Sequence, residues 1–412
     1  MLKYVNLVKI GWLITIKRTL KYVIFNIIQN NSYYHKEYTM KKFLLKRLLF
    51  ILPGVAAYIV TKFAEYHPDW TEQVYSRTVY PVLSTMVGFI PSQVSFSVAE
   101  WLVALFLLFC LGYIIYYVRK IIKSKEERGM VVYRGVAGVV VICSLIYFCF
   151  TALGGLNYHR YSFSYDTGYY VEPFSNEELV ELCMSLAEDI VQARKGLGED
   201  TDLFTPGPGD FDYYAQHSVL AMQMLAEQYP VLDRSLYSAP KPVAMSKIMS
   251  YAGISGVFFP FTLESNINVN EPFFMFPVTM AHELAHQCGF MQEDEANFIA
   301  YLACKQLDDP TMLYSGLFLA FKHSISALEE INPELATEIT SSLSQAVLRD
   351  MLQNEQYLAR YEGIISYISN TVNDLYLKTN NQADGVDSYA RMVDLLLAEQ
   401  RASAGDVDEF RK

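Results

Sequence analysis

The stretch AHELAH, residues 281–286, carries the motif HExxH, which can hold a metal ion when it lies in a helix. Histidines four positions apart project from one helix face, so the imidazoles of His282 and His286 can both reach a single zinc ion. Glu283 points toward the water that the metal activates and can take its proton as the water attacks a carbonyl. The motif therefore predicts two metal ligands and a general base.

The residues on either side of the motif favour a helix of suitable length. Pro277 suits a first helical turn, where no amide donor is needed, and Gly289 suits a C-terminal stop. The alternative is a surface helix with two spare histidines. In a chain with seven histidines, HExxH arises by accident with odds on the order of one in a hundred. We therefore expect a metal-binding helix.

A third protein ligand is expected on the helix that follows, because zinc enzymes of this type use three protein ligands and leave the fourth position to water. That helix contains the segment ExxAN, residues 293–297. Glu293 and Asn297 share a helix face, so one can bind metal while the other holds a liganding histidine. Glu295 lies on a different face and is the competing ligand. We favour Glu293, although helical spacing alone does not decide, and an acidic first turn also suits the helix dipole.

These residues resemble a known group of enzymes. HELAH followed by EDEANFIAYLA is similar to the motif of the gluzincin metallopeptidases, most closely the ImmA/IrrE type, over about thirty residues. The resemblance implies a zinc-dependent peptidase. One position departs from the pattern, because Asn297 stands where gluzincins usually have Asp. An uncharged partner can still accept a histidine N–H bond but raises the basicity of that ligand less.

Five blocks stand out along the chain: VYPVLS (79–84), LNYHR (156–160), GVFFPFT (256–262), HELAHQCGF (282–290) and DSYAR (387–391). In these blocks the chain, from about Met40 onward, resembles a bacterial membrane protein family, domain of unknown function 3810. The resemblance implies a membrane-anchored, zincin-like domain and supplies no substrate. Gluzincins commonly add a Tyr, His or Arg donor that stabilises the oxyanion, so Tyr389 and Arg391 are candidates and His323 is a weaker one.

The first part of the chain is too apolar for an ordinary soluble protein. The 412 residues are 52% hydrophobic with a mean hydropathy of +0.15, and the excess lies in the first 156. Residues 98–118 and 135–156 are apolar runs with aromatic residues near their ends, typical of membrane-spanning helices. Residues 43–63 are interrupted by Lys46 and Arg47. We expect a first span there rather than a cleaved signal peptide, because no convincing cleavage site follows.

Basic residues in the short loops predict the topology. Five of them lie between residues 119 and 128, and a second group lies at 41–47. The positive-inside rule places both groups in the cytoplasm, so that residues 157–412 lie outside the cytoplasmic membrane. Residues 1–39 precede the family resemblance. We interpret them as an extension that arises from a misassigned start codon, with a peripheral amphipathic segment as the alternative.

The outer domain is expected to be α+β and mostly helical. Ser175 and Glu178 form a capping box for a helix to about residue 193, and helical periodicity recurs at 211–229 and in most of 313–402. The segment 241–262 favours short strands. The period-two pattern that follows it predicts one more strand, which could be an edge that pairs with an extended substrate. A plain half-exposed strand explains the alternation equally well.

Charge and cysteine content exclude some classes of protein. The net charge of −11 and the lack of a basic stripe or a Gly-rich phosphate loop argue against nucleic acid partners. Cys183, Cys288 and Cys304 are the only cysteines of the outer domain. An odd number in an oxidising space fits buried free thiols better than disulfides.

We therefore predict a membrane-anchored zinc metallopeptidase with three spans and an extracytoplasmic, zincin-like domain. His282, His286 and Glu293 hold the ion, and Glu283 is the general base and later the proton donor. Its partners are a peptide or protein substrate and the lipid bilayer. The alternative is a membrane-anchored binding or sensor protein with a structural zinc site. An open fourth coordination position facing a cleft favours the enzyme, and a fourth protein ligand favours the structural site.

Overall fold

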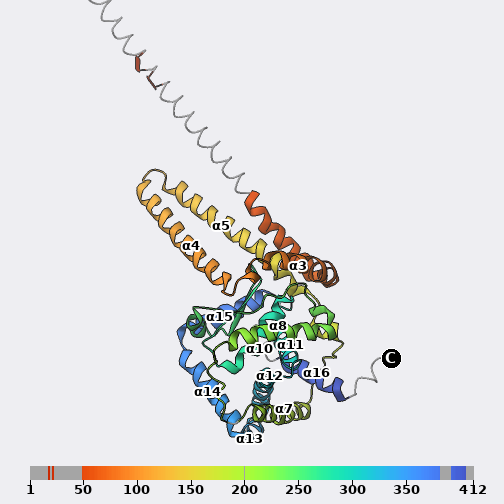
Figure 1. Ribbon diagram of the computed structural model, residues 1–412. Coiled ribbons are helices and arrows are strands. Elements are labelled where there is room, and N and C mark those ends of the chain that lie inside the picture. Colours follow the sequence, from red (N-terminus) through yellow and green to blue (C-terminus); the bar gives the residue numbers. More distant parts are fainter. Residues whose placement is uncertain (1–16, 19–20, 23–48, 199, 381–390, 405–412) are drawn as a thin grey trace, which may run out of the picture. The chain divides into compact units, whose positions relative to one another are not determined.

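The computed structural model describes residues 17–18, 21–22, 49–198, 200–380 and 391–404 (Figure 1). Tyr389 and nearly all of residues 1–39 lie outside this described part. The described residues fall into two compact units, one of residues up to Tyr58 with Tyr117–Phe148, the other of Ile59–Tyr116 with Cys149 onward. The larger unit holds the HExxH motif.

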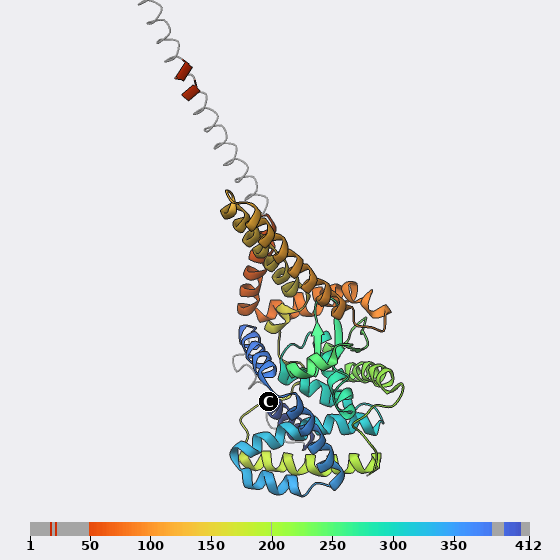
Figure 2. The same cartoon turned by 90° about the vertical axis from the view of Figure 1, so that its left-hand side faces the viewer.

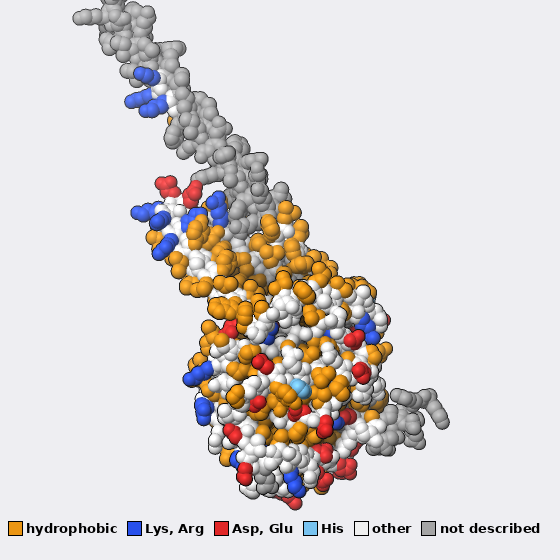
Figure 3. Space-filling model, in the orientation of Figure 1, with side chains coloured by type: hydrophobic (Ala, Val, Ile, Leu, Met, Phe, Trp, Pro, Cys, Tyr) orange, Lys and Arg blue, Asp and Glu red, His pale blue; other side chains and the backbone are white. Residues whose placement is uncertain are grey.

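Three helices in the described part are long and apolar enough to cross a membrane: Leu49–Tyr66, α4 (Val98–Lys123) and α5 (Arg128–Leu153). Their apolar side chains are largely exposed, as expected of a surface that faces lipid. Figure 3 shows these apolar side chains along α4 and α5, with charged side chains at the loop that joins them. The three long apolar helices expected from the sequence are therefore present, and the last starts earlier than expected.

In the smaller unit, the first of these helices packs closely on α5 at Gly54. The Gly54 amide donates to Ser144 Oγ at 3.0 Å, and a Cβ at Gly54 would lie only 2.5 Å from that oxygen. A glycine is needed here because the two backbones approach too closely for a side chain. The Pro53-Gly54 pair, which interrupts the apolar run of this helix, thus lies at a packing contact.

Short helices fill the segment between the apolar helix Leu49–Tyr66 and α4. They are α2 (Pro68–Trp70), the π-helix η1 (Thr71–Val79), α3 (Tyr80–Gly88) and the 3₁₀ helix η2 (Pro91–Gln93).

Helices also make up most of the larger unit after α5. In chain order they are η3 (Gly155–His159), α6 (Phe163–Thr167), α7 (Asn176–Leu197), α8 (Asp210–Gln228), η4 (Pro230–Leu232), α9 (Ser246–Ala252), η5 (Phe273–Met275), α10 (Phe276–Gln287), α11 (Glu293–Cys304), α12 (Pro310–Ile331), α13 (Pro333–Ser341), α14 (Gln345–Tyr361), α15 (Ile364–Thr379) and α16 (Met392–Ala404). The predicted capping box of Ser175 and Glu178 is present at the start of α7.

The described strands form one small sheet. They are β1 (Lys241–Pro242), β2 (Gly256–Phe259) and β3 (Glu264–Ile267), in the order β1-β3-β2. Strand β3 pairs in parallel with β1 and antiparallel with β2, so it is the central strand. The prediction that the alternating strand is a sheet edge is therefore wrong. The expectation of strands throughout 241–262 is also only partly met, because α9 lies between β1 and β2.

The polar side chains of β3 hold the start of α4, and this explains their alternation. The Glu264 carboxylate accepts the Val98 and Ala99 amides at 3.0 and 2.8 Å and pairs with Lys241 Nζ at 2.6 Å. Asn266 Oδ1 accepts from Ser97 Oγ at 2.6 Å. A carboxylate satisfies the unpaired amides of a helix N-terminus and complements its dipole. The polar face of β3 is thus buried against α4.

The hydrophobic core of the larger unit surrounds α10. Figures 1 and 2 show α10 at the centre, with α8, α11 and α12 beside it and the small sheet against another side. Nearly every α10 residue is buried because the helix has neighbours all round. None of the six cysteines, all of them described, forms a disulfide, and Cys183, Cys288 and Cys304 are buried. The prediction of buried free thiols is confirmed.

Candidate metal centre

The turn after α10 reverses the chain and brings α11 alongside. Gly289 adopts φ +89°, a conformation that glycine reaches without a steric penalty. Its amide donates to the His286 carbonyl at 2.9 Å, and the Phe290 amide donates to the Ala285 carbonyl at 3.2 Å. This pair of bonds is a Schellman motif, as expected for a glycine-terminated helix. The helix also carries Pro277 in its first turn, as the sequence predicted.

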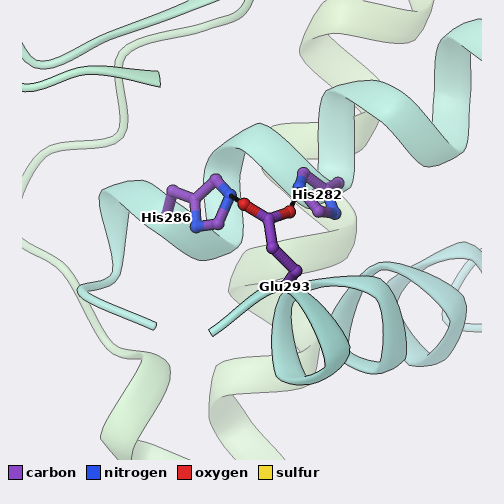
Figure 4. A group of neighbouring side chains, drawn as sticks. All are labelled: His282, His286 and Glu293. Carbon is purple, nitrogen blue, oxygen red and sulfur yellow. Dashed lines mark ion pairs between the residues drawn. The ribbon is translucent and has the colours of Figure 1, made fainter. Parts of the chain in front are cut away.

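Three potential ligands meet between α10 and α11 (Figure 4). Glu293 reaches from the first turn of α11 to both histidines, with its carboxylate oxygens 3.3 Å from His282 Nε2 and 3.9 Å from His286 Nε2. The ligand atoms all lie within 4.8 Å of one another. A tetrahedral zinc ion with bonds near 2.0–2.1 Å has ligand atoms about 3.3 Å apart. The donor set and its spacing therefore fit zinc with small side-chain adjustments.

Both imidazoles are oriented by hydrogen bonds at Nδ1. His282 Nδ1 lies 2.8 Å from Asn297 Oδ1, and His286 Nδ1 lies 2.7 Å from the Phe290 carbonyl oxygen. Because each oxygen accepts a proton from Nδ1, each Nε2 faces the shared space and can offer a lone pair to a metal once it carries no proton. Asn297 thus occupies the position that the ExxAN spacing suggested.

Glu295 lies on a different side of α11 from Glu293. Its Oε1 accepts the Phe163 amide at 2.7 Å, at the start of α6, and the side chain is buried. Burial raises the pKa of Glu295 to about 8, with nearby Asp294 adding to the effect. Of the two glutamates compared in the sequence, the structure places only Glu293 beside the histidines.

The Glu283 side chain lies against Gly256 of β2. A Cβ at Gly256 would lie 2.5 Å from Glu283 Oε1, so the carboxylate fits only because that position is glycine. The Phe258 backbone hydrogen-bonds the carboxylate, while its buried Oε2 has no hydrogen-bond partner among the described residues. Burial raises the pKa of Glu283 to about 8. A carboxylate in this setting is poised to exchange a proton near neutral pH.

The two histidines have different proton affinities. Burial, together with the neighbouring His282, lowers the pKa of His286 to about 4. Burial also opposes the charged form of His282, but the Glu293 carboxylate outweighs it and raises the pKa of His282 above its ordinary value. A metal ion would therefore meet a neutral His286 and would displace a proton shared by His282 and Glu293.

A cavity of about 520 Å³ opens onto these side chains. Its floor includes the three candidate ligands and Glu283. Its walls come from β2 and from helices α12 and α15, and include Gly256, Val257, Phe258, Lys322, His323, Ser369, Asn370, Asn373 and Tyr376. A pocket of this size with a few convergent polar groups is suited to a ligand or a segment of substrate.

The other predicted site residues are distributed differently. Arg391 does not line the cavity; its Nε lies 3.4 Å from Asp294 Oδ2. His323 lines the cavity, and burial lowers its pKa to about 4. His217 was not among the predicted ligands; it stacks on Tyr213, and its Nδ1 lies 2.8 Å from the Tyr213 carbonyl oxygen. Tyr389 lies outside the described residues.

Two tyrosines that the sequence did not single out lie at the cavity wall. Tyr376 of α15 and Tyr158 of η3 are hydrogen-bonded through their hydroxyl groups at 2.9 Å, and both line the cavity. Burial raises the pKa of Tyr376, and the nearby Glu293 carboxylate adds to this. Tyr158 belongs to the block LNYHR, so the sequence could have identified it as a site residue. No motif near Tyr376 identifies that residue.

Comparison with known proteins assigns the chain to a family. Residues 75–397 match the family described as "Protein of unknown function (DUF3810)". The chain belongs to this family. Neither the curated proteins nor the solved structures gave a match. The matched region contains the candidate metal centre and the whole of the sheet, but the family description carries no activity.

Proposed function

We propose that this protein is a membrane-anchored zinc metallopeptidase whose catalytic domain lies on the extracytoplasmic side of the cytoplasmic membrane. One observation carries the proposal. His282, His286 and Glu293 converge at a cavity floor beside Glu283, whose buried Oε2 has no hydrogen-bond partner among the described residues. Three ligands plus a carboxylate that is not a ligand is the composition of a catalytic zinc site.

In this proposal Glu283, His323 and Tyr376 each have a separate role in peptide hydrolysis. Zinc, when bound, supplies Lewis acidity that lowers the pKa of water and polarises a carbonyl. Glu283 takes the proton from the attacking water and later gives it to the leaving amine. His323 and Tyr376 project donors from α12 and α15, where they can stabilise negative charge on the carbonyl oxygen.

The substrate backbone has a place to pair at β2. Among the described strands, β2 pairs on one side with β3 and lies at the edge of the sheet. Its residues Gly256–Phe258 line the cavity directly above Glu283. An extended peptide can add to such an edge as a further strand. We therefore assign substrate pairing to β2 and not to β3, the strand for which the sequence suggested it.

The competing function is a binding or sensor protein with a structural zinc site. A structural site needs a fourth protein ligand. Among the described residues, the candidate cluster consists of His282, His286 and Glu293 alone. Cys288, the nearest cysteine in sequence, directs its thiol to the Leu232 carbonyl instead. We therefore favour the catalytic site.

Paired substitutions in the full-length, detergent-solubilised chain test the proposal. His286→Ala should remove bound zinc, because two ligands hold zinc far more weakly than three. Glu283→Gln should keep about one zinc per chain but cleave a fluorogenic casein probe about 10²–10⁴-fold more slowly. His217→Ala, a histidine remote from the site, is the control for both measurements.

Each outcome bears on a separate part of the proposal. Undiminished zinc content in His286→Ala would exclude the metal site. Wild-type turnover in Glu283→Gln would exclude the assigned base. Zinc that is retained by Glu283→Gln, together with a wild-type chain that cleaves no probe, would favour the sensor protein.

A further inference from the structure

Helix α15 turns its polar side toward the cavity and exposes its apolar side, the reverse of the usual arrangement in a water-soluble protein. Its polar residues Ser369, Asn370 and Asn373 line the cavity. Its opposite side carries an apolar stripe in which the side chains are more than half exposed: Ile364 (76%), Ile368 (55%), Val372 (61%) and Leu375 (65%). The spacing of four, four and three residues keeps these side chains on one helix face.

Helix α9 packs beside α15 and extends the same apolar surface. Met245, Ile248 and Tyr251 are exposed by 54%, 63% and 41%. Tyr251 also contacts Tyr361, just before α15, with ring centroids 5.0 Å apart. Exposed contiguous apolar surface of this kind marks a site of interaction with protein or membrane.

Both helices are held at the ends of the candidate membrane spans. Glu100, in the first turn of α4, accepts the Ala244 and Met245 amides at 3.0 and 2.8 Å at the start of α9. The Tyr376 ring of α15 lies 6.2 Å from the ring of Phe150, in the last turn of α5. These residues belong to the same compact unit, and Figure 1 shows α15 beside that end of α5. Helices α9 and α15 therefore lie next to the first turn of α4 and the last turn of α5.

The apolar side chains and few charges of this surface, next to the candidate membrane spans, favour lipid as its binding partner. The exposed apolar side chains of α4 begin at Trp101, next to Glu100, and Glu100 contacts the start of α9 within the same compact unit. The charged residues of α15 are Asp374 and Lys378, which pair with each other at 2.8 Å. A helix with an apolar face and few free charges, placed at a membrane interface, buries that face among headgroups and acyl chains.

We propose that the apolar faces of α9 and α15 form a membrane-docking surface that embeds in the bilayer interface, while the opposite side of α15 lines the cavity. The proposal rests on α4 and α5 crossing the membrane and not on the metal centre. Ile254 and Val257, which line the cavity, are also exposed, by 36% and 42%.

Tryptophan substitution measures lipid contact in the full-length chain. Leu375→Trp places the probe on α15, and Leu352→Trp places it on α14 at a leucine of similar exposure, 52% against 65%. Each chain is reconstituted in phosphatidylcholine vesicles with or without brominated acyl chains. The spectrum of the wild-type chain, which has three tryptophans, is subtracted. Trp at 375 should be quenched about twofold or more, because an interfacial helix buries its apolar face roughly 5–10 Å into the headgroup and acyl boundary.

The control separates docking from nonspecific adsorption. Trp at 352 should be unchanged by brominated lipid and accessible to aqueous acrylamide. Equal bromolipid quenching at 352 and 375, or none at 375, would overturn the proposal. Protection of Trp at 375 from both quenchers would also overturn it, because a protein partner would then cover the face. Val372→Trp repeats the measurement on the same face if Leu375→Trp does not fold.

Discussion

Asn297 is the residue through which the chain can tune its candidate metal centre. Its Oδ1 lies 2.8 Å from His282 Nδ1, and the side chain is almost completely buried. An oxygen at this position fixes the tautomer and ring orientation of a liganding histidine and raises its basicity. An amide does so less strongly than a carboxylate, because it carries no charge.

The first prediction at the residue scale follows from that contact. Asn297→Ala should weaken zinc affinity about 10–100-fold, because His282 loses the group that orients it. Asn297→Asp should bind zinc at least as tightly as the wild type. Affinity is measured by competition with a chromophoric chelator on the solubilised chain. Equal zinc affinity in Asn297→Ala and wild type would show that the histidine needs no such support.

Residue-level prediction succeeds where spacing along one helix suffices. The placement of His282, Glu283 and His286 follows from a period of 3.6 residues and was available from the sequence. The sequence could not decide between Glu293 and Glu295 as the third ligand, because that choice depends on how α11 is rotated against α10. Tyr376 could not be found at all, since it reaches the cavity from a helix far along the chain.

At the scale of elements, the approach of β2 to α10 sets the position of Glu283. Gly256→Ala would place a Cβ 2.5 Å from Glu283 Oε1, so the carboxylate must move. We expect zinc content to be retained and probe cleavage to fall about tenfold or more, since displacement of a reacting group by about 1 Å is costly. Gly196→Ala on α7, where an added Cβ meets nothing within 4 Å, should keep full activity.

Two other results for Gly256→Ala would contradict this prediction. Full cleavage activity in Gly256→Ala, with zinc retained, would mean that the carboxylate does not need its position against β2. Loss of zinc as well would mean that the substitution disturbs α10 itself.

Elements were predictable where their signal is local. The capping box fixes the start of α7, and long apolar runs mark α4 and α5. The role of β3 was misjudged because period-two alternation reports a polar face without saying what covers it. In the structure the start of α4 covers that face, through Glu264 and Asn266, which is a contact between segments more than 160 positions apart.

At the scale of the whole molecule, basic residues should fix the orientation in the membrane. Five of them lie between residues 119 and 128, where α4 gives way to α5, and they should remain in the cytoplasm. Alkaline phosphatase fused after Lys412 should therefore be active, and the same enzyme fused after Ser124 should be inactive. The reverse pattern would overturn the proposed extracytoplasmic catalytic domain.

Stability of the whole chain should fall as the pH rises toward neutrality. Glu271 is buried, and burial raises its pKa from 4.5 to about 7, against the opposing effects of Ser255 and Lys322. A raised acid pKa stabilises the fold fully below pH 4.5, and this contribution is lost as the pH rises through about 7. Burial raises the pKa of Glu283 and Glu295 to about 8, which acts in the same direction.

Glu271→Gln isolates one part of that pH dependence. The neutral amide cannot ionise, so the variant should unfold close to the wild-type temperature at pH 5 and at a higher temperature at pH 8. The difference at pH 8 should be on the order of 3 kcal/mol at most, because the pKa is raised from 4.5 to about 7. Thermal unfolding of the solubilised chain measures it. Glu338→Gln, at an exposed position of α13, should follow the wild type at both pH values. Because burial is the dominant cause at Glu271, parallel curves for Glu271→Gln and wild type would show that this carboxyl is hydrated in the folded chain.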